Sequence, residues 1–221
     1  MALAANALVT IATVEEDLGI SSGSEDSKLT RYINAASEAI AKYCHRLFHR
    51  DTARVEKVAG HGNPKLRLGS GPINSVTSIV YDGGTIDSDS YEIHNANAGL
   101  LYGINGWNWT AAAIDDVSNT PVPGTERKLY TVTYDGGYYT APQVASGGDY
   151  EGETRNLPYD VEEACIELVR AIRSGKKRDP DVKSERLLSW SANYGTASAS
   201  EASAMLPASV RRLLNQYRWS V

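Results

Sequence analysis

The sequence predicts an α+β protein with a mainly α-helical bundle core, an inserted antiparallel β lobe and a C-terminal helix. Three observations support this fold class. Apolar residues recur at helical spacing over 26–48 and again over 160–173. Between these stretches, over 52–140, the pattern changes to short alternating segments separated by Asn, Asp and Gly. Pro207 then begins a last helical stretch, at a position that favours proline.

Three zones follow from this order. We expect the N-terminal helices of the core in 1–50, the inserted β lobe in 51–140 and the C-terminal helices of the core in 141–221. The last zone includes a Ser/Ala-rich flexible linker near 195–204 and a terminal docking tail. A chain of 221 residues is long enough for one domain that carries such an insert.

The N-terminal zone predicts a short helix and a long one. Thr13 and Glu16 have the spacing of a capping box, and Gly19 is expected to end the short helix. Ser24 is expected to open the second helix, which continues to about residue 48 and is the longest in the chain. Its middle allows another helix to approach closely because it is rich in alanine: Ala35, Ala36, Ala39 and Ala41.

Strand signals dominate the β lobe. A β-branched stretch over 73–80 closes at Asp82 and Gly83, which form a strong turn signal. Further strands are predicted at 91–93, 99–102 and 129–134. The pattern of Trp107 and Trp109 around Asn108 favours a strand edge. The stretches 111–126 and 141–156 are predicted to be loops.

The C-terminal zone begins with a second long helix. Asp160 is its expected N-cap, after Pro158, and Gly175 is expected to follow its end. Residues 183–194 have strand-like spacing. The final helix after Pro207 carries an apolar stripe of Val210, Leu213, Leu214 and Tyr217.

Composition limits the possible functions. The net charge of −5 disfavours a protein that coats nucleic acid generally. The aromatic residues are 13 Tyr and 4 Trp against 1 Phe, and Tyr and Trp suit half-wet interfaces. No apolar run approaches the roughly 20 residues that span a membrane, and the N-terminus does not resemble a signal peptide. We therefore expect a protein made in the cytoplasm with no membrane partner.

Metal and cofactor chemistry is not expected. His45 and His49 are four residues apart on the predicted helix and could bind zinc, but further ligands are not evident. Cys44 and Cys165 lie on apolar helix faces, so we expect two buried free thiols, with a disulfide as the alternative. No P-loop or dinucleotide-binding fingerprint occurs, which removes the common phosphate-binding cofactors.

No catalytic constellation is evident either, so the sequence predicts that the protein is not an enzyme. Gly60, His61 and Gly62 read as a flexible turn, and His94 has no marked partner for a triad. The acidic residues that could form a carboxylate pair lie in predicted turns, where such side chains mainly accept hydrogen bonds from nearby backbone amides: Asp87, Asp89 and Glu92, or Asp115 and Asp116.

The segment 170–186 is the strongest charge feature. It holds seven cations and three acids, a local charge of +4 in an acidic chain. Three interpretations remain open: a surface that faces the phosphates of DNA, a docking patch for an acidic partner, or a solvated helix end. The candidate residues for DNA or an acidic partner are Arg173, Lys176, Lys177, Arg178 and Lys183.

The C-terminal end is the second feature. Trp, Tyr and Arg are the usual anchors of protein interfaces, which favours a tail that docks on a partner protein. The alternative is that Trp219 folds back onto its own core. The candidate docking residues are Arg211, Arg212, Tyr217, Arg218 and Trp219.

The order and spacing of several weak motifs resemble one known family. The motifs lie at 8–10, 18–20, 35–40, 43–48, 71–83, 132–138, 157–161, 184–195 and 206–218. Together they resemble the head–tail connector subunits of tailed bacteriophages, also called adaptor or head completion proteins. The likeness covers nearly the whole chain, although the loops at 111–126 and 140–156 are longer than usual in that family.

This resemblance implies a structural role in a virion. Such proteins form a homo-oligomeric ring, usually of twelve copies, beneath the portal protein in the neck. The ring extends the channel through which double-stranded DNA passes without sequence specificity, and it is the platform for the next neck, stopper or tail protein. The resemblance also implies that helices form the ring body, that the C-terminal segment reaches toward the portal and that the β lobe faces outward.

Two other functions are alternatives to this role. A stopper or tail terminator is usually rich in β-strands, whereas this chain has two long helical stretches. A carbohydrate-binding or hydrolytic module would use an exposed Trp107 and Trp109 in the β lobe to stack on sugars.

Overall fold

The computed structural model describes residues 2–108, 130–177, 184–187, 190–193 and 206–218. The chain folds into two compact units. Met1–His45 and Tyr139–Val221 form the first, which we call the helical unit, and Arg46–Tyr138 form the second, the β unit. Helices and antiparallel sheets are both present, so the α+β class is confirmed.

Helix α1 (Ile11–Leu18) begins earlier than the sequence predicted. Its N-cap is Thr10, whose hydroxyl oxygen accepts a hydrogen bond from the amide of Thr13 at 3.2 Å. The predicted capping box of Thr13 and Glu16 is therefore wrong, because both residues already lie inside the helix. Gly19 ends the helix as predicted, with a left-handed φ of 60° that glycine adopts without strain.

Helix α2 (Asp26–Cys44) is shorter than expected at both ends. Glu25 stands at the N-cap position, whereas the Ser24 hydroxyl donates a hydrogen bond to the carbonyl of Ser21. At the other end His45 turns left-handed, with a φ of 53°. The helix therefore stops at Cys44 and not near residue 48, although apolar spacing continues beyond it.

Helix α4 (Tyr159–Lys177) has the same length as α2, 19 residues, so neither is the single longest helix. Tyr159 follows Pro158 directly, which places Asp160 in the first turn and not at the N-cap. Gly175 lies inside the last turn, so the predicted stop there is wrong. Cys165 is buried and free, as is Cys44, which confirms two free thiols. The Cys165 sulfur contacts the Ser37 hydroxyl of α2 at 3.8 Å.

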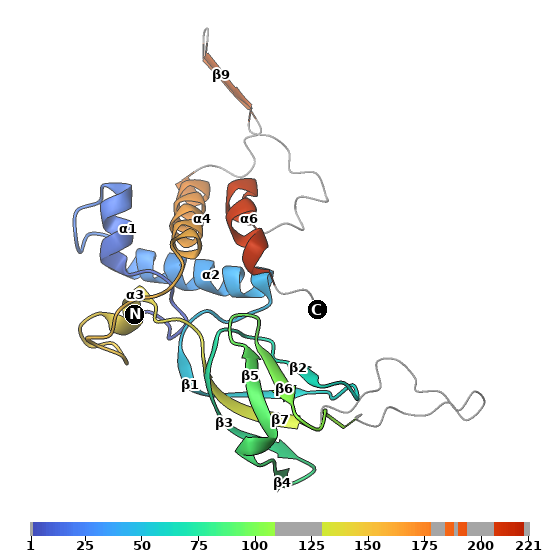
Figure 1. Ribbon diagram of the computed structural model, residues 1–221. Helices are drawn as coiled ribbons and strands as arrows, with labels where there is room; N and C mark the ends of the chain where they lie inside the picture. The colour runs from blue at the N-terminus through green and yellow to red at the C-terminus, as the bar shows by residue number, and fades with distance from the viewer. Residues whose placement is uncertain (1, 109–129, 178–183, 188–189, 194–205, 219–221) are drawn as a thin grey trace. The chain divides into compact units, whose positions relative to one another are not determined.

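Among the described residues of the helical unit, helices α1, α2, α4 and α6 (Ala208–Leu214) do not share one axis. Helices α1, α4 and α6 stand side by side with α4 in the middle, and α2 runs across them (Figure 1). The sequence predicted a mainly α-helical bundle core. The structure instead shows a crossed helical layer in one unit and a second core in the β unit.

Shorter elements complete the helical unit. Within the stretch predicted as loop, α3 (Ala141–Val144) is one helical turn with a capping box of Thr140 and Gln143. Strands β8 (Ser184–Leu187) and β9 (Trp190–Asn193) pair antiparallel, as the strand-like spacing of 183–194 predicted. Residues 178–207 separate α4 from α6 in sequence, although the two helices pack together.

The larger sheet of the β unit has the order β1-β7-β3-β4, and all its pairs are antiparallel. Its strands are β1 (Asp51–Val58), β3 (Ile73–Tyr81), β4 (Gly84–Thr85) and β7 (Tyr130–Gly136). The β3–β4 turn is the predicted one. Asp82 and Gly83 both have positive φ, of 46° and 81°, as a tight hairpin turn requires. Strand β1 had no signal in the sequence.

The second sheet has the order β2-β6-β5, also antiparallel. It consists of β2 (Lys65–Arg67), β5 (Tyr91–Asn95) and β6 (Leu100–Gly103). The two strands predicted near 91–93 and 99–102 are confirmed as β5 and β6. A short 3-10 turn, η1 (Ser88–Ser90), precedes β5, and the Asp87 carboxylate accepts a hydrogen bond from the amide of Asp89 at its start.

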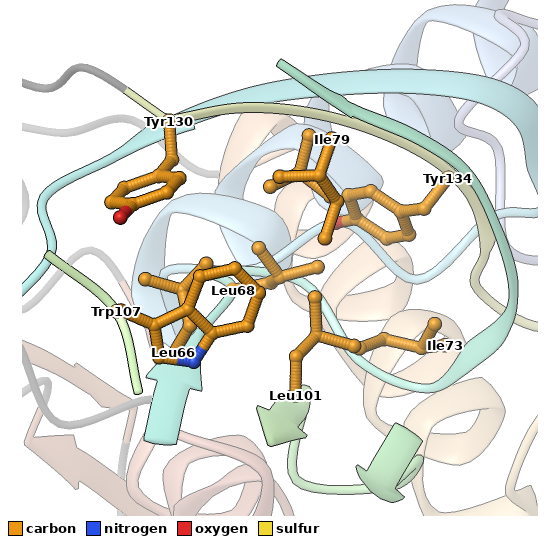
Figure 2. Packing of buried hydrophobic residues seen from close by; sticks show 9 residues of the cluster. Leu66, Leu68, Ile73, Ile79, Leu101, Trp107, Tyr130 and Tyr134 are labelled. Atoms are coloured by element: carbon orange, nitrogen blue, oxygen red, sulfur yellow. The ribbon is translucent and has the colours of Figure 1, made fainter. Parts of the chain in front are cut away.

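A buried apolar cluster joins the two sheets. Figure 2 shows its side chains pointing toward one another from both sheets. Trp107 belongs to this cluster with 3% of its surface exposed, and its indole nitrogen donates a hydrogen bond to the carbonyl of Pro64 at 3.0 Å. The predicted exposed strand edge at Trp107 is therefore wrong, while Trp109 lies outside the described residues. The cluster comprises Leu66, Leu68, Ile73, Ile79, Leu101, Trp107, Tyr130, Val132 and Tyr134.

A polar network is buried next to this cluster. The Tyr134 hydroxyl donates to Glu56 Oε1 at 2.7 Å, and Glu56 Oε2 accepts from the amide of Gly69 at 2.6 Å. Burial first, and then the hydrogen bond to Glu56, raise the pKa of Tyr134 far above its usual value. Arg54 is also buried and donates to the carbonyl of His49 at 2.8 Å. The β unit therefore depends on paired polar groups as well as on apolar packing.

Candidate functional site

The C-terminal helix α6 is packed into the helical unit. Val210 and Leu214 have no exposed surface, and α6 lies against α4. Pro207 is the N-cap of α6, so the prediction that it begins this helix is confirmed. After the helix, the turn η2 (Asn215–Tyr217) brings Gln216 to the Asp160 carboxylate at 2.7 Å. The end of α6 is thus fixed at the start of α4.

The same end of α6 is also tied to α2. The Tyr43 hydroxyl donates a hydrogen bond to Asn215 Oδ1 at 2.7 Å. The guanidinium carbon of Arg218 lies 5.5 Å from the centre of the Tyr43 ring, within the range of a cation–π interaction. The last described residues are therefore held against the surface of the helical unit.

Four of the five C-terminal candidates lie in the described residues, and they differ in how exposed their side chains are. Arg211 and Tyr217 are half-buried, and the Tyr217 hydroxyl lies 3.4 Å from the Asp160 carboxylate. Arg212 and Arg218 are exposed. Trp219 lies outside the described residues. Exposed cations suited to a partner are therefore Arg212 and Arg218.

The basic segment is only partly a free positive surface. Arg170 donates to both carboxylate oxygens of Asp17 at 2.7 Å, and these hydrogen bonds raise the pKa of its guanidinium. Arg173 pairs with Glu25 at 3.1 Å. Both arginines thereby connect α4 to the region of α1 and the start of α2.

Two further candidates of the basic segment lie at the C-terminal end of α4. Lys176 and Lys177 lie in the last turn of α4, where the helix dipole favours cations. Arg178 and Lys183 lie outside the described residues.

One exposed aromatic site had no signal in the sequence. The side chain of Tyr159 is 78% exposed, and the guanidinium of Arg155 lies 4.2 Å from the centre of its ring. Arg155 is held in turn by an ion pair with Glu162 at 2.7 Å. Burial raises the pKa of Glu162 and the charge of Arg155 opposes this rise. The result is a fixed tyrosine–arginine stack at the start of α4.

The proposed zinc geometry does not exist, because α2 ends at Cys44 and the two histidines are not four apart on a helix. Within the described ranges, no group of three His, Cys, Asp or Glu side chains could hold a metal ion. His94 is exposed on β5, and Asp115 and Asp116 lie outside the described residues. Burial raises the pKa of Cys165 to about 12, so this thiol is a poor nucleophile.

A cavity of about 370 Å³ opens between the N-terminal segment and the α3 region. Its described lining contains alanine, glycine and short polar residues, and Asp149 is the charged residue among them. That lining offers neither histidine nor cysteine nor lysine for acid–base or nucleophilic chemistry. Among the described helices, none has the length and apolar character that a membrane span requires.

The fold is similar to that of chains in solved particles of gene transfer agents (GTA). One, from the neck of an empty GTA particle computed with C6 symmetry, has a TM-score of 0.55 and 14% identity, and the match covers 100% of this chain and 94% of that one. Another, from the virion of a native gene transfer agent particle, has a TM-score of 0.52 and 16% identity, with 100% and 94% covered. A third, from the neck of a native GTA particle computed with C12 symmetry, has a TM-score of 0.50 and 13% identity, and the match covers 100% of this chain and 93% of that one. At such identities the likeness shows the fold.

No curated protein matches the sequence. The family comparison is specific, because the model of the head completion protein family matches residues 7–220. The chain therefore belongs to the head completion protein family, as its motif order and spacing had indicated.

Proposed function

We propose that this protein is a ring subunit of a virion neck that binds beneath the portal, extends the DNA channel and provides the platform for the next neck or tail protein. The observation that carries the proposal is the fold likeness along the full chain to neck chains of GTA particles, joined with membership of the head completion family. The role is structural and needs no catalytic group.

A ring of twelve copies is the assembly we propose. One of the similar chains belongs to a neck computed with C12 symmetry, and another to a neck computed with C6 symmetry. Both symmetries are compatible with twelve subunits around one axis. A closed ring places each copy in the same environment, so one pair of complementary surfaces suffices to build it.

We propose Arg218 and Trp219 as the portal-docking residues. Arg218 is exposed and directly precedes Trp219 at the end of a fixed helix. Arg211 and Tyr217 serve as internal support, because both are half-buried at the same helix end. Tryptophan and arginine are the residue types that most often dominate the binding energy of interfaces.

For passing DNA or an acidic partner, we propose Lys176, Lys177, Arg178 and Lys183. Arg173 is left out because its charge is offset by Glu25. Contacts to phosphates carry no sequence information, which suits a channel that DNA only traverses.

Portal rings mixed with the purified chain test this proposal. Native mass measurement is expected to show rings of the chain on portal rings. If the chain remains monomeric with portal rings present, the proposed function is wrong.

A second experiment addresses the docking residues. Removal of everything after Leu206 would also remove the buried Val210 and Leu214, so loss of binding would only report unfolding. A stop after Arg218 removes Trp219 and spares the helix. We expect portal affinity to fall about tenfold or more, as for a typical hot-spot residue, with an unchanged melting temperature. Arg31→Ala, at an exposed arginine of α2, is the control, and equal portal affinity of the truncated and full chains would contradict the assignment.

A further inference from the structure

The row of helices α1, α4 and α6 has two ends, and these ends differ in charge. Because α4 packs against both other helices, α1 and α6 are the outer members of the row (Figure 1). The α1 sequence, IATVEEDL, contains three acids and no base. The α6 sequence, ASVRRLL, contains two bases and no acid. The helical unit is therefore acidic at one end of the row and basic at the other.

On α1, one carboxylate is available on the outer face. Glu15 is buried and accepts a hydrogen bond from the amide of Gly23, while Asp17 is occupied by Arg170. Glu16 is exposed, on the side of the helix opposite the buried Val14. Its exposed neighbours on this face are small: Ala12 and Thr13.

On α6, Arg212 has the corresponding position. It is exposed and lies on the side of the helix opposite the buried Val210 and Leu214. Its exposed neighbours, Ala208 and Ser209, are also small. Within the part of the chain that the structure describes, neither Glu16 nor Arg212 forms an ion pair.

We propose that the outer face of α1 in one copy of this chain docks on the outer face of α6 in the next copy, with Glu16 facing Arg212. This inference rests on the proposed ring function and names the lateral contact of that ring. The two faces differ from each other, so the contact is head-to-tail and leaves a free face on each side, and such contacts form a ring when the rotation between neighbours closes. Small side chains on both helices allow close approach.

The contact is weak by itself. The large apolar side chains that are exposed in the described residues are Leu47, Val55, Ile93, Ile104 and Tyr159, and none lies on α1 or α6. An exposed ion pair contributes at most about 1 kcal/mol and is screened by salt. A single lateral contact therefore selects the neighbour and its register, and the stability of the ring comes from the repetition of this contact and from the portal surface to which the ring binds.

Cysteine cross-linking tests the geometry. Glu16→Cys and Arg212→Cys chains are mixed under conditions in which native mass measurement shows rings, and treated with a short bismaleimide. The native thiols Cys44 and Cys165 are buried. We expect cross-linked dimers in the mixture and not in either variant alone. Equal dimer yield in Glu16→Cys alone, or no dimers in the mixture, would overturn the proposal, and Glu153→Cys with Arg212→Cys is the negative control.

Charge exchange tests the electrostatics. Glu16→Arg and Arg212→Glu are each expected to weaken ring formation about fivefold at low salt, the equivalent of about 1 kcal/mol. The double variant is expected to recover to within about twofold, because the pair is restored in reverse. Glu153→Arg, an exposed loop change of equal charge, controls for net charge. If the unmodified chain forms rings and the double variant does not recover, this contact is wrong, whereas a chain that never forms rings refutes the proposed function itself.

Discussion

Each of the two units of this protein is stabilised internally by a different kind of polar contact. The β unit buries polar groups: Tyr134, Glu56 and Arg54 are paired next to an apolar cluster that includes Trp107. The helical unit has the more exposed ion pairs, such as Arg170 with Asp17, whose side chains are 46% and 26% exposed, although its Arg155–Glu162 pair is only 21% and 15% exposed. Buried pairs specify one arrangement and are costly to break, whereas exposed pairs contribute little and respond to salt. The β unit is therefore expected to be sensitive to single substitutions and to pH, and the helical unit to ionic strength.

The largest effect is expected at Trp107. Trp107→Ala removes the ring that packs edge-on against Tyr130 and leaves a cavity between the two sheets, at a cost of about 3–5 kcal/mol. Chemical denaturation measures the loss, and hydrogen exchange locates it in the β unit. Ile104→Ala, at a residue 60% exposed, is the control and should change stability by less than about 0.5 kcal/mol. Comparable losses in both variants would remove the distinction between core and surface.

A smaller loss is expected from the polar network. Tyr134→Phe keeps the ring but removes the hydroxyl that donates to Glu56, so a half-buried carboxylate oxygen loses a donor. We expect about 1–3 kcal/mol of destabilisation. Tyr159→Phe, at the exposed tyrosine of α4, should be nearly silent in the same melting experiment. A neutral Tyr134→Phe would mean that the hydroxyl is not needed by the β unit.

The stability of the β unit is also expected to depend on pH through His49. Burial, and then the charge of Arg54, lower the pKa of His49 below 6.5. The unfolded chain then binds a proton more readily than the folded one, so stability is lost as the pH falls below about 6.5. Urea midpoints measured between pH 7.5 and 5 should decline less steeply in His49→Gln than in the unmodified chain. Identical slopes would show that His49 does not carry this dependence.

The smallest effect is expected in the helical unit. Arg170→Ala should cost no more than about 1 kcal/mol, since the pair with Asp17 is partly exposed. The difference from the unmodified chain should vanish at about 1 M salt, where screening is nearly complete. Thermal melts at low and high salt measure it. A loss that persists at high salt would place this pair in the same class as the buried network.

Local chemistry made parts of the fold predictable. The turn at Asp82 and Gly83 and the helix stop at Gly19 need only the residues at those positions, and both were predicted correctly. Strand β1 was missed because its pattern is inverted: Arg54 points inward and Val55 is 57% exposed. The inward Arg54 donates hydrogen bonds to the carbonyls of Leu47 and His49 and interacts with the distant Tyr134 of β7, and no periodicity within β1 reports these partners.

Long-range contacts limited the prediction of functional residues in the same way. Arg173 counts as a free cation in the sequence, yet its partner Glu25 is 148 positions away. Apolar spacing past Cys44 suggested a longer helix, whereas Phe48 is buried in the β unit. The available face of α1 could not be read from IATVEEDL, because only packing shows that Glu15 and Asp17 are occupied and Glu16 is not.

The packing of α6 on α4 has a consequence for how this chain can vary and be engineered. Val210, Leu214 and the contact of Gln216 with Asp160 hold the two helices together, whatever length of chain connects them. Residues 194–205, which lie between strand β9 and the buried Leu206, can therefore gain residues without altering the helical layer. A fluorescent or affinity label inserted between 195 and 204 should leave the protein folded and mark each copy of it in an intact particle.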